Sequence, residues 1–229
     1  YAFRHGGVAQ RLWAITPDDL SLAMSTDGGL TYTKISDGAD GVLDWSYTGS
    51  RLWYVHSGGI KYSDNLGASW TAAHTFSVSI ASITANGSQI VVAHSDDAGL
   101  FEPACTISNN NGGSWTTTVI TAALPNSPRN PYLFGNAIHV CVTGGGYIYI
   151  YYFEESANAV LSDRHIAMYS TDGLVWAATG LNIAQASSAT EPTMWSRGLH
   201  AITSGSTGSA GFVALRTTNV TRGLDSSAG

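Results

Sequence analysis

The sequence predicts an all-β fold built from repeated antiparallel hairpins. Charged residues make up only 11% of the 229-residue chain, and Lys and Glu, which usually build helix surfaces, are scarce. The 26 glycines, together with many Ser, Thr, Asn and Asp residues, indicate numerous turns. A turn motif with nearly constant internal spacing also recurs along the chain, at starts 38, 45 and 62 residues apart, and this repetition predicts a repeat architecture.

Each copy of the motif reads Ser-x-Asp/Asn-x-Gly-x-x-aromatic. The copies are STDGGLTY (25–32), SDNLGASW (63–70), SNNNGGSW (108–115) and a one-residue-shorter STDGLVW (170–176). A strand-like run precedes and follows each copy, so each is expected to be the turn of a β-hairpin. The Asp or Asn accepts backbone hydrogen bonds, and Gly supplies a positive φ. The aromatic ring is expected to wedge between neighbouring sheets.

We therefore expect the motif residues to be structural rather than catalytic, because bonding within the turn explains their spacing. They are Ser25, Asp27, Gly29 and Tyr32; Ser63, Asn65, Gly67 and Trp70; Ser108, Asn110, Gly112 and Trp115; and Ser170, Asp172, Gly173 and Trp176. If the Trp70 and Trp115 rings are buried between sheets, replacing either by Ala should destabilise the fold by roughly 3–5 kcal/mol. No residue is assigned as catalytic.

The motif resembles the Asp box of the bacterial neuraminidase repeat family, directly over about residues 1–181. The resemblance implies a β-propeller of four-stranded antiparallel blades, in which each box joins the third and fourth strands. We expect one domain, 1–229, of about five blades, the last degenerate or incomplete. A closed five-bladed ring and part of a six-bladed ring both fit this length. The expected blades span approximately 1–36, 37–76, 77–121, 122–181 and 182–229.

The resemblance also implies that function lies on the face opposite the boxes, in loops between second and third strands and between blades. Loops on a rigid scaffold commonly carry binding residues. Calcium is left open as a ligand of the paired Asp96 and Asp97, since hard cations take carboxylate oxygens, and no other cofactor or metal is expected. The candidate ligand-binding residues are Asp18, Asp19, Asp96, Asp97, Glu102, Arg129, Tyr132, Glu154, Glu155, Asp163, Arg164, Glu191 and Trp195.

Composition excludes other classes of partner. The net charge is −6 and the basic residues are scattered, which argues against nucleic-acid binding. No apolar run approaches the roughly 20 residues that cross a bilayer, so no membrane insertion is expected. Cys105 and Cys141 lie in apolar, strand-like contexts and are interpreted as buried thiols, with a disulfide between them left open. Because the chain begins with Tyr1 rather than Met, we expect a processed form or an excised domain.

A sialidase-like glycoside hydrolase is the alternative that the resemblance raises. That chemistry needs an arginine cluster for the substrate carboxylate, a Tyr nucleophile with a Glu partner, and an Asp acid/base. Phe3-Arg4 matches only the first half of the family's Phe-Arg-Ile-Pro motif. Whether the chain is an enzyme is therefore left uncertain, and a non-catalytic role is favoured.

The favoured function is a binding or scaffolding propeller that is extracellular or part of a virion. One form is an adhesin-like module that recognises carbohydrate or a surface, and the other is a structural component of a phage tail or other assembly. The expected partners are accordingly a glycan or cell-surface receptor, or protein subunits that could include further copies of the chain.

Overall fold

Every regular element in the described part of the chain is a β-strand. The computed structural model describes residues 4–5, 11–16, 18–36, 41–78, 81–95, 103–120, 138–142, 146–154, 164–184, 195–204 and 209–217. Of residues 4–5, 151–154, 164–166, 178–184 and those from 195 onward, only the backbone is described. Within the described ranges, no helix has the length and apolar character to cross a membrane.

The described strands form four four-stranded antiparallel sheets and one two-stranded sheet, each a meander in chain order. Blade 1 holds β1 (Arg4–His5), β2 (Leu12–Ile15), β3 (Leu22–Ser25) and β4 (Thr33–Lys34). Blade 2 holds β5 (Val42–Tyr47), β6 (Leu52–His56), β7 (Gly59–Ser63) and β8 (Thr71–Thr75). Blade 3 holds β9 (Ala81–Asn86), β10 (Gln89–Ser95), β11 (Pro103–Ser108) and β12 (Thr116–Val119). Blade 4 holds β13 (His139–Val142), β14 (Ile148–Glu154), β15 (Arg164–Ser170) and β16 (Ala177–Ala184), and the terminal sheet holds β17 (Trp195–Ser204) and β18 (Ser209–Thr217).

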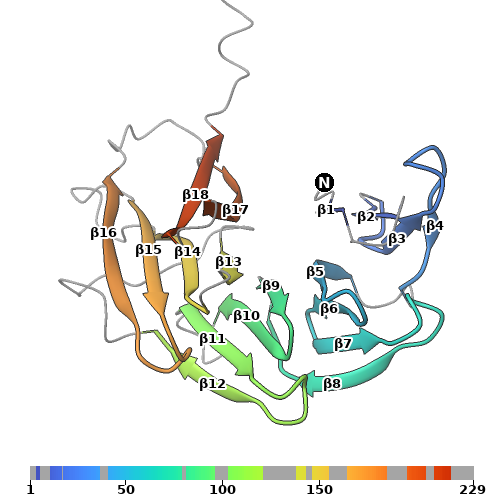
Figure 1. Cartoon of the computed structure of the whole chain (residues 1–229), viewed down its shortest axis with the longest axis horizontal. Coiled ribbons are helices and arrows are strands. Elements are labelled where there is room, and N and C mark those ends of the chain that lie inside the picture. Colours follow the sequence, from blue (N-terminus) through green and yellow to red (C-terminus); the bar gives the residue numbers. More distant parts are fainter. Residues whose placement is uncertain are drawn as a thin grey trace, which may run out of the picture.

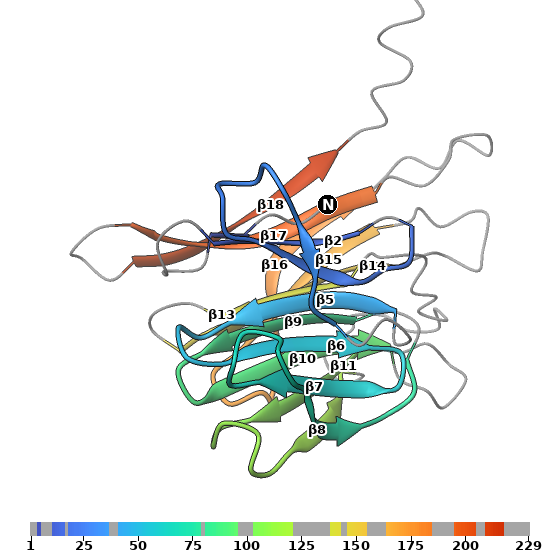
Figure 2. The ribbon, with the colours of Figure 1, turned by 90° about the vertical axis from the view of Figure 1, so that its right-hand side faces the viewer.

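The sheets stand around a common axis with the first strand of each nearest the centre (Figure 1). The inner strands follow one another, because β5 contacts β9, β9 contacts β13 and β13 contacts β17. The strands of successive sheets run roughly along this axis (Figure 2), and a gap in the arc separates the terminal sheet from blade 1 (Figure 1). This is the arrangement of a β-propeller, so the predicted fold class is confirmed. The domain limits and the division into five units stay a prediction.

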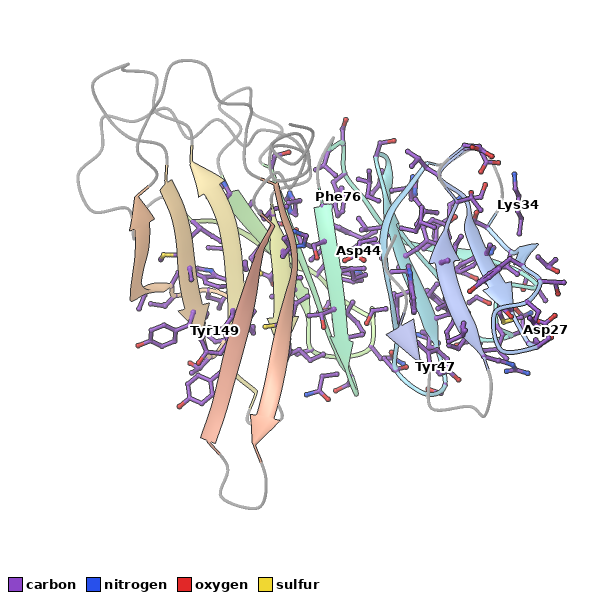
Figure 3. The ribbon with its side chains drawn as sticks, turned by 90° about the horizontal axis from the view of Figure 1, so that it is seen from above. Asp27, Lys34, Asp44, Tyr47, Phe76 and Tyr149 are labelled. Atoms are coloured by element: carbon purple, nitrogen blue, oxygen red, sulfur yellow. The ribbon has the colours of Figure 1, made fainter. Side chains whose placement is uncertain are left out.

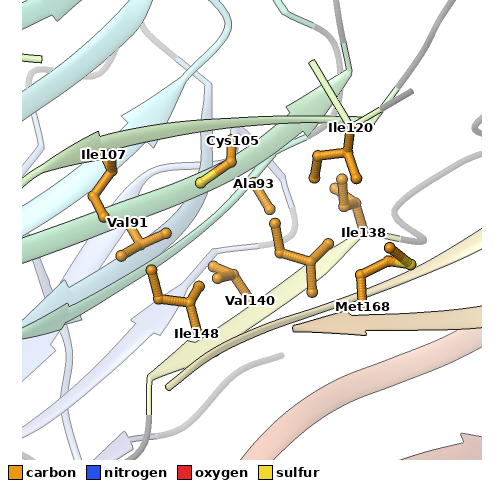
Figure 4. Close-up of a cluster of buried hydrophobic side chains, with 10 residues drawn as sticks. Val91, Ala93, Cys105, Ile107, Ile120, Ile138, Val140, Ile148 and Met168 are labelled. Carbon is orange, nitrogen blue, oxygen red and sulfur yellow. The ribbon is translucent and has the colours of Figure 1, made fainter. Parts of the chain in front are cut away.

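Each apolar core lies between two blades rather than within one. Alternate side chains of a strand point to opposite faces of its sheet. On β10, Ile90 and Val92 therefore pack toward blade 2, whereas Val91 and Ala93 pack toward blade 4. Figure 4 shows the second of these cores, in which Val91 and Ala93 lie among side chains of blade 4 such as Ile148. All three described clusters join consecutive blades in this way.

Both cysteines are buried, and Cys105 belongs to the core between blades 3 and 4. Cys105 and Cys141 are buried and do not form a disulfide. Burial raises the pKa of the Cys105 thiol well above its ordinary value of 9.0, because the charged thiolate would lose its hydration. Their interpretation as buried thiols is confirmed.

The predicted motifs connect the third and fourth strands of blades 1 to 4, and we term these four segments (25–32, 63–70, 108–115 and 170–176) the repeat turns. In blades 2 to 4 the aromatic ring of the turn packs back onto the preceding blade. Trp70 Nε1 donates a hydrogen bond to the Ile35 carbonyl, 2.6 Å away, and Trp115 stacks on His74 with ring centroids 5.4 Å apart. Trp176 packs against the core between blades 3 and 4. The three rings are half-buried.

The glycine of the turn also touches the preceding blade. A Cβ added to Gly112 would lie 2.8 Å from Trp53 Cη2, and one added to Gly67 would lie 2.7 Å from Ile35 Cβ. Both glycines have positive φ, 87° and 95°. Glycine is therefore needed for the turn conformation and also for the close approach of the next blade.

Gly112→Ala is expected to destabilise the protein more than Gly28→Ala. Both positions have positive φ (87° and 75°), so both substitutions carry the left-handed penalty of about 1–2 kcal/mol. A Cβ at Gly28 meets nothing within 4 Å, whereas one at Gly112 must displace the buried Trp53 ring, which adds about 1–3 kcal/mol. Urea unfolding of the two variants measures the difference. Equal losses would show that blade contact does not constrain the turn.

Trp70→Phe is expected to cost more than Trp115→Phe. Trp70 loses a hydrogen bond to the Ile35 carbonyl, worth about 1 kcal/mol, whereas Trp115 Nε1 has no hydrogen-bond partner among the described residues. Because both rings are half-buried rather than buried, the corresponding Ala variants should fall near the lower end of the expected range, about 3 kcal/mol. Chemical denaturation with tryptophan fluorescence and circular dichroism gives all four values. A larger loss for Trp115→Phe would contradict this ranking.

Candidate functional site

The meander places two kinds of connection at opposite ends of the blades. The repeat turns and the links between first and second strands lie at one end, the turn end. The links between second and third strands and those between blades lie at the other, the loop end. Figure 3 shows Lys34, Asp44 and Phe76 toward the loop end and Asp27 and Tyr47 toward the turn end. The described strand ends that flank the segments predicted to bind ligand are thus separated from the repeat turns.

Most of the predicted ligand-binding residues lie outside the described part of the chain. For Glu154, Arg164 and Trp195 the backbone alone is described. Glu154 and Arg164 are directly paired across β14 and β15, and Trp195 begins β17, so all three lie at the loop end. Their role in binding stays a prediction. The residues outside the description are Asp96, Asp97, Glu102, Arg129, Tyr132, Glu155, Asp163 and Glu191.

Asp19 is held by its own loop and by β4. Its carboxylate pairs with Lys34 Nζ and accepts hydrogen bonds from the Thr16 hydroxyl and the Ser21 amide. Lys34, followed by Thr16, holds the pKa of Asp19 well below its ordinary value of 3.8. The neighbouring Asp18 is exposed. Of this predicted pair, Asp19 therefore fastens the loop, and Asp18 presents its carboxylate to solvent.

Two polar side chains of β5 bind the backbone of the neighbouring inner strand, and the sequence prediction missed both. Asp44 Oδ2 accepts hydrogen bonds from Ser82 Oγ (2.8 Å) and from the Ile83 amide (2.9 Å). Ser46 Oγ accepts one from the Ala85 amide (3.0 Å). Since β9 is the inner edge of its sheet, these amides have no strand partner on that side. Asp44 and Ser46 thus supply the hydrogen-bond acceptors for backbone amides at the inner edge of this sheet.

The link continues from blade 3 to blade 4. Ser82 Oγ, which donates to Asp44, also accepts from the Val140 amide of β13 at 3.4 Å. Three consecutive inner strands are therefore joined near the loop end. Polar residues at alternating positions of the inner strands, Asp44 with Ser46 and Ser82 with Thr84, are the sequence signal that could have indicated these links.

At the turn end, a buried serine organises each repeat turn. Ser25 Oγ donates to Asp27 Oδ1 (2.7 Å) and accepts from the Gly29 amide (2.8 Å). The serines of the other three turns make the same two bonds to their own Asp or Asn and Gly. The serine, acid or amide, and glycine of the motif therefore act as one hydrogen-bonded unit.

The Ser or Thr hydroxyl just before the aromatic residue allows either Asp or Asn at the third position of the turn, because it can bond to both. Thr31 Oγ1 donates to Asp27 Oδ2 at 2.6 Å. In the second turn the direction reverses, because Asn65 Nδ2 donates to Ser69 Oγ at 2.8 Å, and the third turn repeats this arrangement. A hydroxyl can both donate and accept, so it satisfies either partner. The Ser or Thr before the aromatic residue was visible in the sequence and was not used.

His94 of β10 is buried at the loop end with both ring nitrogens engaged. Nε2 bonds to the Thr106 hydroxyl and Nδ1 to the Ser95 carbonyl, each at 2.8 Å. Its ring stacks on Phe76 with centroids 5.0 Å apart. These contacts make it part of the interface between blades 2 and 3. Within the described ranges, no group of three His, Cys, Asp or Glu side chains could hold a metal ion, and the Asp96–Asp97 pair considered for calcium lies outside them.

Comparison with known proteins supports the fold alone. No protein-family model matches the chain, and no curated protein does. A chain of a nidogen/laminin complex matches with a TM-score of 0.53 at 10% identity, over 79% of this chain and 62% of that one. A thermostable family-43 glycoside hydrolase matches with a TM-score of 0.48 at 18% identity, over 76% of this chain and 64% of that one. YCF48 bound to a D1 peptide matches with a TM-score of 0.38 at 14% identity, over 74% of this chain and 77% of that one.

The chain therefore spans less than two thirds of the first two of these structures. At such identities the likeness concerns architecture and carries no activity. The first of these matches, with its TM-score of 0.53, agrees with the all-β architecture described above.

Asp27→Asn is expected to reduce the acid sensitivity of the protein without disrupting the turn. The Thr31 hydroxyl and amide hold the pKa of Asp27 well below its ordinary value of 3.8. A lowered pKa in the folded state means that the stabilisation is present above about pH 4 and is lost as the pH falls below it. Asn can keep the turn by reversing the Thr31 bond, as Asn65 does.

The measurement is the thermal midpoint between about pH 3 and pH 7 for the parent, Asp27→Asn and Asp27→Ala. The Asn variant should match the parent at neutral pH and lose less stability on acidification. The Ala variant should already be less stable at neutral pH. Identical acid profiles for parent and Asn variant would contradict the assignment.

Proposed function

We propose that this chain is a non-catalytic scaffolding and recognition propeller of the Asp-box (bacterial neuraminidase repeat) family, acting in a virion or an extracellular assembly. The observation that carries the proposal is how the carboxylates in the described part of the chain are used, apart from the exposed Asp18. Asp19, Asp27, Asp44, Asp64 and Asp172 are each bound by donors of the chain itself. A glycosidase instead needs carboxyl groups that exchange protons or attack the substrate.

Membership of the Asp-box family is supported by the repeat turns. All four turns share the bond from the serine hydroxyl to the Asp or Asn and the bond from the Gly amide to the serine. Each turn also joins the third and fourth strands of a blade, the position that the resemblance implies.

The turn end supports protein subunits as partners. Leu30 in blade 1 and Leu174 and Val175 in blade 4 are 86%, 48% and 74% exposed at the outermost part of their turns. The matching positions in blades 2 and 3 carry small residues such as Ala68 and Gly113. Leu174 and Val175 are neighbours in one turn, and contiguous exposed apolar surface is typical of protein interaction sites. We therefore assign subunit contacts to the turn end and leave the loop end for a glycan or receptor.

Subunit contact is tested by light scattering of the purified chain over a range of concentrations. The parent is expected to self-associate, and Val175→Asp should weaken that association because it places a charge among apolar contacts. Val119→Asp is the matched control, since Val119 is also exposed (36%) but lies on β12. A parent that stays monomeric at all concentrations, or equal effects of both variants, would remove self-assembly from the proposal.

Recognition at the loop end is tested on a broad glycan array that includes bacterial surface polysaccharides. Saturable binding should fall in Tyr132→Ala or Trp195→Ala and persist in Tyr147→Ala, whose exposed ring lies at the turn end. If the folded protein binds nothing on the array, only the scaffolding role remains in the proposal. Turnover of a fluorogenic sialoside that is lost in Arg4→Ala would overturn the non-catalytic assignment in favour of the sialidase-like alternative.

A further inference from the structure

In blades 2 and 3, a polar side chain at the start of the second strand bonds to the residue after the motif serine. Arg51 donates two hydrogen bonds to the Asp64 carboxylate, from Nε at 2.6 Å and from Nη2 at 3.0 Å. Gln89 Nε2 donates to Asn109 Oδ1 at 3.1 Å. Arg51 and Gln89 are equivalent, because the residue after each of them pairs with the motif serine of its blade. Each turn thus binds the strand start beside it.

Arg11 has the same position in blade 1 but lacks an acidic partner. The next residue, Leu12, pairs with the motif serine Ser25, and the residue after that serine is Thr26. Thr26 carries no charge, and no ion pair or hydrogen bond joins the partly exposed Arg11 side chain to the described residues. The turn end of blade 1 therefore carries a guanidinium, always charged, that no described carboxylate of its own chain neutralises.

Asp172 in the turn of blade 4 is the converse case, a carboxylate with one oxygen left over. Its Oδ1 accepts two turn amides and the motif serine hydroxyl, as Asp27 Oδ1 does in blade 1. The Val175 and Leu174 amides hold the pKa of Asp172 below its ordinary value of 3.8, so the group is charged at neutral pH. Asp27 Oδ2 is bound by Thr31, but the matching residue in the shorter turn is Val175, which has no hydroxyl. Asp172 Oδ2 thus has no donor among the described residues.

Asp172 lines a cleft between the turns of blades 3 and 4. The cleft has a volume of about 180 Å³, and Asn109, Ser114 and Leu174 also line it. Sites for small molecules usually span about 300–1,000 Å³, so this cleft has room for little more than one protein side chain. A basic side chain that entered it would bring hydrogen-bond donors and a positive charge to Asp172 Oδ2.

We propose that the occupant is Arg11 of a second copy, so that two chains associate turn end against turn end. The inference rests on the subunit contact proposed for that end and names its partner. A two-fold axis would set blade 1 of each copy against blade 4 of the other, and the pair Arg11–Asp172 would then form twice. The fork of a guanidinium matches a carboxylate, as the Arg51–Asp64 pair shows at the same end of the blades.

The apolar side chains of the turn end fit the same arrangement. Leu30 of blade 1 and Leu174 and Val175 of blade 4 are exposed, and the two-fold axis brings one set toward the other. The turns of blades 2 and 3, which lie between, carry Ala68 and Gly113 at the position of Leu30. Such small residues permit a close approach of the two copies. Charge and apolar surface are thus complementary within a single chain, as a self-complementary interface requires.

The test is a double-mutant cycle on the full chain with Arg11→Gln and Asp172→Asn, read as the dimer dissociation constant from analytical ultracentrifugation. Each single substitution should raise that constant about tenfold, because an exposed ion pair contributes a factor of about three and the symmetry makes it act twice. The double variant should be no weaker than either single one, since both substitutions remove the same contact.

Two controls accompany the cycle. Asp18→Asn removes an exposed carboxylate at the loop end and should leave the dissociation constant unchanged. Thermal unfolding checks that Asp172→Asn keeps its turn, as expected because Asn occupies this position in the second and third turns. Arg11→Gln alters no bonded group of the described chain, so it carries the test alone if the Asn variant does not fold.

Three results would overturn the proposal. Unchanged dissociation constants in both single variants, with weakening by Val175→Asp, would show that the copies meet elsewhere on the turn end and would leave the proposed subunit contact intact. A double variant about a hundredfold weaker than the parent would show that the two charges act independently. A parent that does not self-associate would exclude a second copy as the occupant, and recognition at the loop end, which the glycan array tests, would be unaffected.

Discussion

The structure depends on one constraint, which is that a blade has no core of its own. Each sheet has two apolar faces, and each of the three described cores forms where consecutive blades meet. Burial of apolar surface is the main favourable term in folding, so a single blade could not be stable alone. The features of the repeat turn follow from this. The turn must bend sharply and carry no side chain at Gly67 or Gly112, where the preceding blade lies close. It must also place an aromatic ring against that preceding blade.

The packing of blades against one another also places demands on polar groups. Sheet edges that meet around an axis bury backbone amides, and these amides need hydrogen-bond acceptors. Asp44, Ser46 and Ser82 bind amides of the next inner strand, and Arg51 reaches the Asn111 carbonyl in the turn of blade 3. Short polar side chains suit this role because they reach the backbone with little loss of conformational entropy. Among the described residues, short polar side chains therefore serve two uses, which are bonds within the repeat turns and bonds between neighbouring sheets.

Sequence reasoning found the parts of the fold that are local. A serine, an acid and a glycine within one turn interact over a few residues, so their spacing alone predicts the hairpin. The partners of Asp44 lie 38 and 39 residues away in another blade, and no local pattern identifies them. Tyr32 and Trp70 occupy the same motif position, but their environments differ because blade 1 stands at the end of the arc. At the loop end, Asp19 pairs with Lys34 and accepts a hydrogen bond from Thr16 of its own loop. Ligand binding by Asp19 and the other candidates stays a prediction that rests on residue type and position.

The need for neighbours also connects the architecture to function. In a repeat fold each unit buries the apolar face of its neighbour, so a terminal unit has a face left for binding another partner. Blade 1 exposes Leu20, Leu30 and Tyr32, at both ends of the same sheet. At the turn end of this blade the Tyr32 ring is 38% exposed and the Leu30 side chain is 86% exposed. Blade 1 therefore presents apolar side chains at both of its ends, and attachment of a subunit to this terminal blade would cover them.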